Sequence, residues 1–242
     1  MIIVRKLIKR FGLKTVLRGM DFRVEPGEFV ALLGPNGAGK TTFLRILASL
    51  SRPTLGEVQI AGYRLPGQAA AVRRRLGVVS HLPLLYGDLT ADENLRFYGR
   101  MYGVPALDQR VSQVLELVGL SARRRDLVRT FSRGMQQRLA IGRAVLHDPD
   151  VMLFDEPHTG LDQEACLMLD NVLREVAARG RTVVITGAND ESDLRFFGSL
   201  VADVLPNLAV GFEIETASST RRRAATTSVR RRTVEAGEPS SL

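Results

Sequence analysis

The sequence has a single cysteine, no tryptophan and no apolar run long enough to cross a lipid bilayer. Cys166 has no second cysteine to pair with, which excludes an internal disulfide and fits a reducing compartment. A membrane-spanning helix needs about 20 consecutive apolar residues, and no segment approaches this length. Residues 1–11 are basic but lack the apolar core and the small-residue cleavage site of a signal peptide, so we expect none.

The charge is unevenly distributed. The formal net charge is +8, and residues 217–242 alone hold six arginines and two glutamates, so half of the excess lies in this short stretch. The other half is spread over the rest of the chain, which has the charge of an ordinary protein surface. Because the sequence also lacks an RNP-type aromatic segment and zinc-finger spacing, we expect no nucleic-acid partner.

The apolar pattern predicts an α/β fold. Residues 29–33, 151–154 and 182–186 are short apolar runs, which are typical of strands buried on both faces of a parallel sheet. Apolar and polar residues alternate near the N-terminus, which indicates half-buried strands before the first of these runs. Helical spacing from residue 90 to about 146 predicts a helical subdomain, at about residues 88–136, inserted between the strands of a sheet covered on both faces.

A glycine-rich loop follows the first buried strand. Residues 34–42 match G-x-x-x-x-G-K-[ST], with a strand before and a helix after. Glycines let successive amides turn toward a phosphate, and the helix start adds its positive end. Lys40 can place its charge on the phosphates, and the Thr41 hydroxyl can ligate Mg²⁺. The candidate nucleotide-binding residues here are Gly34, Pro35, Asn36, Gly37, Ala38, Gly39, Lys40, Thr41 and Thr42.

Two carboxylates follow the second buried strand. Asp155 and Glu156 should lie at the carboxyl edge of the sheet, where ligands bind in open α/β folds. We expect Asp155 to hold Mg²⁺ through water, and Glu156 to orient or deprotonate the attacking water. An acidic pair after a strand is common in loops, so the assignment depends on the nearby phosphate loop.

Ser132 opens a helix that starts at residue 133 and can serve as its N-cap. Taken locally, this segment could be no more than a capped helix start. Together with four other elements in the same order, it resembles the ABC ATPase family over roughly residues 1–186. The elements are Phe11, residues 34–42, Ser132-Arg133-Gly134-Met135-Gln136, Asp155-Glu156 and Gly160-Leu161-Asp162.

The resemblance implies a P-loop NTPase (ABC ATPase) core with an N-terminal antiparallel β subdomain and an inserted helical subdomain. It implies ATP and Mg²⁺ as ligands, a head-to-tail dimer with a second copy or a homologous domain, and a separate transmembrane permease. The chain would then lie at the cytoplasmic face of the membrane as a peripheral subunit. Hydrolysis would reopen the dimer and drive the permease.

The same resemblance implies roles for individual residues. Ser132 and Gly134 would cap the γ-phosphate bound by the other copy, and Phe11 would stack on adenine. Considered alone, Phe11 is more often a core residue. Asp162 would reach across the dimer interface, although it could equally be a helix N-cap. Within the family, residues 89–98, 132–140 and 156–163 are similar to the haem-exporter ATPase of cytochrome c maturation, and exporters of drugs or lipids share much of this pattern.

Two positions depart from the family pattern. His81 stands where the family usually has a Mg²⁺-ligating glutamine. We expect His81 to keep a role in the reaction, so the candidate catalytic residues are Glu156, Lys40 and His81. The alternative is that His81 is a histidine in a surface turn without such a role. Ala188 stands where the family has a histidine beside the γ-phosphate. Losing such a polar group costs about 10²–10³ in rate. The sequence therefore leaves open both an ATPase of impaired activity and a clamp that binds ATP without hydrolysing it.

The family likeness is lost after residue 186. We predict a nucleotide-binding domain over residues 1–212, without the closing strands usual for the family, and a disordered basic tail over residues 213–242. One hypothesis is that the chain from about Gly187 is translated out of its original reading frame. The alternative is a divergent tail whose arginines bind anionic lipid.

Overall fold

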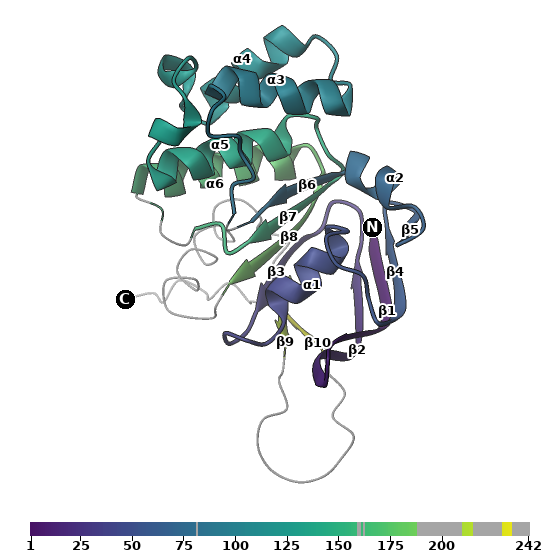
Figure 1. Ribbon diagram of the computed structural model, residues 1–242. Coiled ribbons are helices and arrows are strands. Elements are labelled where there is room, and N and C mark those ends of the chain that lie inside the picture. The colour runs from purple at the N-terminus through teal and green to yellow at the C-terminus, as the bar shows by residue number, and fades with distance from the viewer. Residues whose placement is uncertain (81, 159–160, 162, 188–209, 215–228, 234–242) are drawn as a thin grey trace, which may run out of the picture.

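The computed structural model describes residues 1–80, 82–158, 161, 163–187, 210–214 and 229–233 (Figure 1). Two sheets form the framework. The first is antiparallel in the order β2-β1-β4-β5, with β1 at Ile2–Phe11, β2 at Lys14–Val24, β4 at Leu55–Ile60 and β5 at Tyr63–Leu65. The second has the order β10-β9-β3-β8-β7-β6, with β3 at Phe29–Leu33, β6 at Leu76–Val79, β7 at Val151–Asp155, β8 at Thr182–Gly187, β9 at Val210–Ile214 and β10 at Val229–Thr233. Its pairs are parallel except β9 with β10.

The second sheet is buried on both faces, as its apolar runs predict. Every residue of β7 and β8 is buried. Alternate residues of a strand point to opposite faces, so Met152 and Phe154 join one core cluster while Val151 and Leu153 join the other. The first cluster packs under the helical layer, and the second packs under α1 and the antiparallel sheet.

The helices divide between these faces. Helices α3, α4, α5 and α6 form the upper layer in Figure 1, whereas α1 lies between the two sheets. Helix α3 begins at a capping box, in which Thr90 and Glu93 satisfy each other's backbone amides. The helices are α1 at Lys40–Leu47, α2 at Ala69–Arg74, α3 at Ala91–Tyr102, α4 at Leu107–Leu117, α5 at Arg133–Val145 and α6 at Gln163–Ala178, with 3₁₀ turns at Ser121–Arg123 and Val128–Thr130. The predicted fold class is confirmed.

The C-terminal region corrects two expectations. Strand β9 pairs with β3 and β10 pairs with β9, so closing strands are present and residues 229–233 are not disordered. The physical reason is backbone pairing. The outer edge of β3 exposes unpaired N–H and C=O groups, which β9 satisfies, and β10 then covers the edge of β9. Apart from these two strands, the chain after residue 187 lies outside the described residues.

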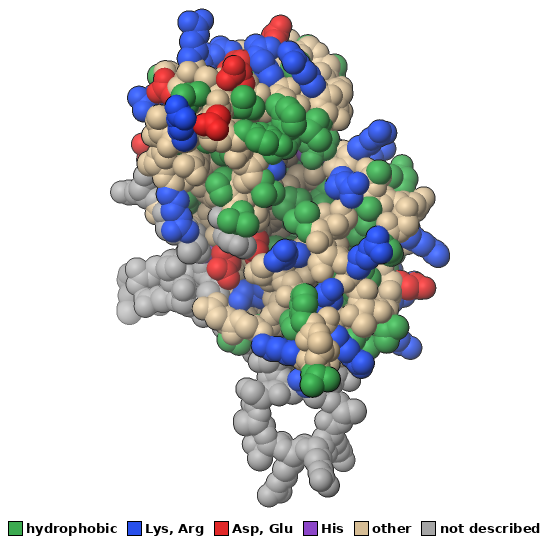
Figure 2. Space-filling model, in the orientation of Figure 1, with side chains coloured by type: hydrophobic (Ala, Val, Ile, Leu, Met, Phe, Trp, Pro, Cys, Tyr) green, Lys and Arg blue, Asp and Glu red, His purple; other side chains and the backbone are tan. Residues whose placement is uncertain are grey.

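Helix α5 approaches β6 closely enough that only glycine fits at residue 77. A Cβ atom built there would lie 2.5 Å from the carbonyl oxygen of Ala144 and would also collide with Met152. This contact locks the helical layer onto the sheet. On the face drawn in Figure 2, apolar side chains gather between the helical layer and the rest of the molecule.

We predict that Gly77→Ala lowers the free energy of unfolding by about 1–3 kcal/mol, because the added methyl group overpacks the contact between α5 and β6. Urea denaturation followed by circular dichroism measures this. Gly67→Ala is the matched control, since a Cβ atom there meets nothing within 4 Å. It should change the stability by no more than about 0.5 kcal/mol. Equal stabilities of the two variants would contradict the close approach.

Candidate nucleotide-binding site

The phosphate loop connects β3 to α1. Two of its glycines have left-handed backbone conformations, with φ of +82° at Gly37 and +101° at Gly39. Gly39 is the N-cap residue of α1, and a Cβ atom there would lie 3.0 Å from Leu17 and 3.1 Å from Val16 on β2. Both the backbone angle and the neighbouring strand therefore require glycine at this position.

Lys40 is buried inside the loop, with only 4% of its side chain exposed. Its ammonium group donates hydrogen bonds to the carbonyl oxygens of Gly34 at 2.6 Å and Pro35 at 3.2 Å. The same nitrogen lies 4.0 Å from a carboxylate oxygen of Glu156. The loop thus holds a positive charge at its centre, at the start of a helix whose first amides point the same way.

Asp155 joins three elements at the carboxyl edge of the sheet. Its Oδ1 atom accepts hydrogen bonds from the hydroxyl groups of Thr186 on β8, at 2.9 Å, and Thr41 on α1, at 3.1 Å. No group of three or more His, Cys, Asp or Glu side chains within the described residues could hold a metal ion. Magnesium needs no such cluster, because it is commonly held by one or two carboxylates together with substrate phosphates and water. The oxygen atoms of Thr41 and Asp155 fit that chemistry.

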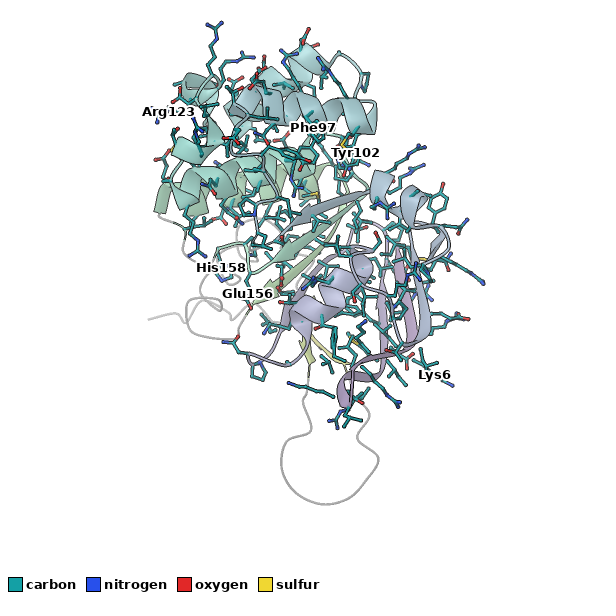
Figure 3. All side chains as sticks on the ribbon, in the orientation of Figure 1. Lys6, Phe97, Tyr102, Arg123, Glu156 and His158 are labelled. Atoms are coloured by element: carbon teal, nitrogen blue, oxygen red, sulfur yellow. The ribbon has the colours of Figure 1, made fainter. Side chains whose placement is uncertain are left out.

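Glu156 has an unusual backbone conformation for a non-glycine residue, with φ of +47°. Its amide donates a 3.1 Å hydrogen bond to the hydroxyl oxygen of Thr186, which holds this conformation. About a third of its side chain is exposed, so water can reach the carboxylate. Figure 3 shows Glu156 and His158 beyond the carboxyl ends of the central strands, on the side of the sheet where α1 begins.

The other predicted site residues lie apart from this group or outside the described residues. Ser132 caps α5, accepting a 3.2 Å hydrogen bond from the amide of Met135, so the predicted N-cap is confirmed. Phe11 is 53% exposed at the end of β1, and the ammonium group of Lys9 lies 4.7 Å from its ring centroid. Within the described part of the chain, no hydrogen bond or ion pair joins Ser132 or Gly134 to the phosphate loop. His81, Asp162 and Ala188 lie outside the described residues.

A buried lysine in a glycine-rich loop, with an acidic strand end beside it, defines a P-loop nucleotide-binding protein. The chain belongs to the ABC transporter family, whose sequence profile matches residues 17–159. Among solved structures, an ATP-binding subunit of an ABC transporter superposes with a TM-score of 0.76 and 29% identity, covering 88% of this chain and 85% of that one. A dimeric bacterial ABC transporter cassette superposes with a TM-score of 0.74 and 27% identity, and the match covers 88% of this chain and 94% of that one.

Curated relatives are also similar over most of the chain. The Nod factor export ATP-binding protein I of Ralstonia nicotianae is 42% identical over 185 residues, which are 76% of this chain and 58% of the relative. The linearmycin resistance ATP-binding protein LnrL of Bacillus subtilis is 37% identical over 180 residues, 74% of this chain and 58% of that protein. The chain therefore spans about 58% of the length of these relatives, and their names do not support the narrower likeness to haem exporters.

Sequence reasoning missed Thr186. It is fully buried, and its hydroxyl bridges Asp155 and the amide of Glu156. In the sequence it is only the last residue of an apolar run, and a threonine there is an ordinary strand residue. Its register opposite Asp155 on the neighbouring strand gives it its position, and that register is visible only in the structure.

We predict that Thr186→Val lowers the free energy of unfolding by about 1–3 kcal/mol and weakens magnesium-dependent nucleotide binding. Valine has the same shape but leaves one lone pair of Asp155 and the amide of Glu156 without a partner. Thermal unfolding and titration with a fluorescent ATP analogue measure the two effects. Thr186→Ser keeps the hydroxyl and should retain nucleotide binding close to that of the native chain. If the valine and serine variants have equal stability and equal nucleotide affinity, the hydroxyl bridge has no role.

Proposed function

We propose that this chain binds MgATP and hydrolyses it as the nucleotide-binding subunit of an ABC exporter. The observation that carries the proposal is the grouping at one edge of the sheet. Lys40 lies inside the loop, the Thr41 hydroxyl contacts Asp155, and Glu156 lies beside the lysine. Family membership supports the same ligand, because a dimeric ATP-binding cassette bound to ADP and Pi shares this fold with a TM-score of 0.78.

Each residue has a role that follows from its position. The amides of residues 34–40 and the Lys40 ammonium group bind the phosphate oxygens, replacing the carbonyl contacts that Lys40 makes in this structure. Thr41 and Asp155 would hold Mg²⁺, which neutralises charge on the phosphates when bound. Glu156, partly exposed at the end of β7, orients the attacking water and accepts its proton.

The dimer proposal follows from the placement of the two halves of the site on different elements of one chain. The loop starts α1, whereas Ser132 and Gly134 start α5 in the helical layer, and Ser132 is exposed. We infer that the exposed start of α5 meets the phosphate loop of a second copy arranged head to tail. The dimeric cassettes of similar fold support this arrangement.

The proposed partner is a separate transmembrane permease, which would place the chain at the cytoplasmic face of the membrane. No helix of the described residues is long and apolar enough to cross a bilayer. The proposed surface for a cytoplasmic segment of the permease is that near residues 82–88, where Leu82, Leu84 and Tyr86 are exposed. The sequence pattern makes haem one candidate for the transported cargo. The names of the relatives concern Nod factor export and linearmycin resistance, so a lipid-like or drug-like molecule is the other candidate.

A second candidate is an ATP clamp with negligible turnover, favoured by Ala188 at the family's histidine position. Steady-state phosphate release separates the two. If the missing imidazole limits the rate, Ala188→His should raise phosphate release by about 10²-fold while Glu156 is intact, and should do nothing in a Glu156→Gln background. An unchanged rate in both backgrounds would exclude this limitation.

We predict that Lys40→Met weakens magnesium-dependent ATP affinity by roughly tenfold or more, because it removes the charge at the centre of the loop. Glu156→Gln should keep the affinity but lower phosphate release by about 10²–10⁴. Isothermal titration and a phosphate-release assay measure these effects. Lys6→Met, at an exposed position far from Glu156 in Figure 3, is the control and should match the native chain. Unchanged ATP affinity in Lys40→Met would refute the proposed function.

A further inference from the structure

Charge is distributed unevenly between the segments of the chain. Residues 1–80, which we call the basic lobe, hold fourteen Lys and Arg against four Asp and Glu, a net charge of +10. Residues 82–187 hold thirteen against fourteen. Figure 2 shows Lys and Arg side chains spread over α1 and the antiparallel sheet, whereas most Asp and Glu side chains lie on the helical layer. The net charge of residues 1–216 looks ordinary only because a basic lobe is averaged with more acidic segments.

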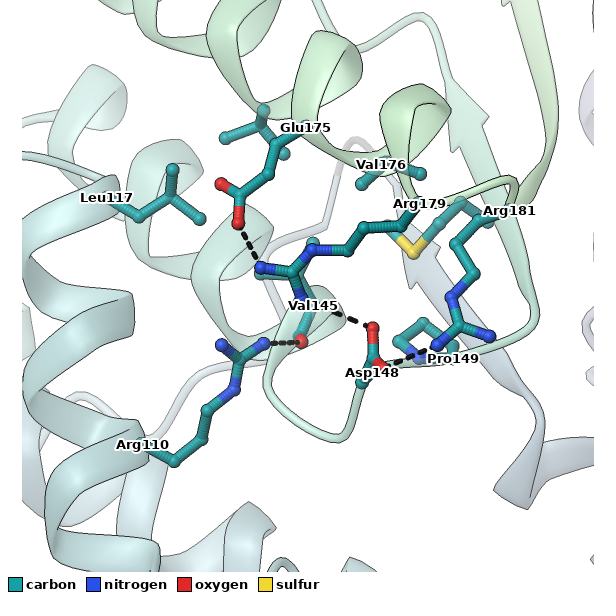
Figure 4. A pocket seen from close by; sticks show the side chains of 11 residues that line it. Arg110, Leu117, Val145, Asp148, Pro149, Glu175, Val176, Arg179 and Arg181 are labelled. Atoms are coloured by element: carbon teal, nitrogen blue, oxygen red, sulfur yellow. Dashed lines mark hydrogen bonds and ion pairs between the residues drawn. The ribbon is translucent and has the colours of Figure 1, made fainter.

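Most cations outside the basic lobe are paired with acids. Seven of the thirteen Lys and Arg of residues 82–187 pair with carboxylates in the described part of the chain. Figure 4 shows an example, in which Arg179 pairs with both Asp148 and Glu175 at the wall of a cavity. In the basic lobe only three of the fourteen cations have a carboxylate partner among the described residues, namely Arg23, Lys40 and Arg75. The other eleven keep their charge available for a partner.

Four of these unpaired cations meet at the loop between α1 and β4. Arg45 lies in the last turn of α1, and Arg52 follows it in the loop. The ammonium group of Lys9, on β1, donates a 2.8 Å hydrogen bond to the carbonyl oxygen of Arg52. Arg73, in the last turn of α2, donates a 3.2 Å hydrogen bond to the hydroxyl oxygen of Ser49 in the same loop. We call these four cations the basic edge.

Two large apolar side chains of the same loop are exposed. Leu50 is 56% exposed and Leu55 is 58% exposed, and Arg52 lies between them in the sequence. Leu55 pairs with Ile8 on β1, the neighbour of Lys9. The fold therefore places exposed leucines among the unpaired cations. Such a combination suits a partner that offers both anionic groups and an apolar layer.

A lipid bilayer with anionic headgroups offers both features. Its phosphate groups attract Lys and Arg side chains, and the boundary between headgroups and acyl chains accepts leucine side chains. Nucleic acid offers phosphates without an apolar layer, and its single strands are bound by stacking of bases on aromatic rings. Residues 48–55 contain no aromatic residue. The leucines beside the cations thus favour the bilayer over nucleic acid.

We propose that the basic edge, together with Leu50 and Leu55, binds directly to the anionic headgroups of a lipid bilayer. The cations pair with phosphate oxygens, and the two leucines enter the boundary below them. This contact with lipid goes beyond the proposed function, since it requires neither ATP hydrolysis nor a permease. It also differs in place from lipid binding by the arginines of residues 213–242.

The test is co-sedimentation of the full chain with lipid vesicles. We expect vesicles of equal parts phosphatidylcholine and phosphatidylglycerol to bind the chain roughly tenfold or more tightly than vesicles of phosphatidylcholine alone, because the latter carry no net charge for the basic edge. Higher salt should weaken binding to the anionic vesicles, since it screens the cations. Inorganic phosphate at the concentration of the lipid phosphate should not compete, because it offers no apolar boundary.

Variants locate the contact on the basic edge. Arg52→Gln and Arg73→Gln should each weaken binding to the anionic vesicles roughly fivefold. Arg125→Gln, exposed between α4 and α5, is the matched control and should bind as the native chain does. Leu55→Ser should weaken binding at low and high salt alike, because salt does not screen an apolar contact. Leu167→Ser is its control, at a leucine that is 59% exposed on α6.

Three outcomes would overturn the proposal. The first is equal binding to both kinds of vesicle, and the second is native binding by Arg52→Gln and Leu55→Ser. The third is loss of binding only when the arginines of residues 221–232 are replaced by glutamine, which would assign the contact to that segment. Duplex DNA that binds as tightly as the anionic vesicles would also overturn it, since phosphates alone would then suffice. MgATP titration of the same samples checks that each variant is folded and separates this failure from failure of the proposed function.

Discussion

The arrangement of the site depends on the hydrogen bonds that the carboxylate of Asp155 accepts. One oxygen atom accepts hydrogen bonds from Thr41 on α1 and Thr186 on β8, and Asp155 itself ends β7. Because β7 and β8 run parallel, with Asp155 paired to Thr186, their carboxyl ends meet at one edge. The start of α1 is held to that edge through the same atom. The phosphate loop, the acidic strand end and the neighbouring strand are therefore fixed relative to each other by these contacts.

The site also stores backbone strain. Glycine makes left-handed backbone at residues 37 and 39 inexpensive, but Glu156 adopts it with a full side chain, at a cost of roughly 1–2 kcal/mol. The hydrogen bond from its amide to Thr186 offsets part of that cost. This conformation places its carboxylate 4.0 Å from the Lys40 ammonium. Backbone strain of this kind is often found at functional positions, which agrees with the role that we propose for Glu156.

The sequence predicts features whose signals are local. The phosphate loop at residues 34–42 has a fixed spacing, and the buried strand before Asp155 has an uninterrupted apolar run, so both could be predicted. The role of Thr186 could not, because it depends on register with a strand 31 residues away. Strands β9 and β10 were missed for a related reason: they are held by pairing along the edge of β3, which leaves little trace in composition.

The Ser132 segment and the nucleotide site are connected by rigid elements. Helix α5 begins at the exposed Ser132 segment and ends beside β6, so its 13 residues span about 20 Å at 1.5 Å per residue. Arg143 near its end bonds Val78 of β6, and Gly77 allows α5 and β6 to touch. Strand β6 pairs in turn with β7, which ends at Asp155. Helix α5 therefore cannot shift against β6 without breaking a contact for which there is no spare volume. The Ser132 segment at the start of α5, which we propose for the second copy, is thus tied to the same sheet that ends at Asp155.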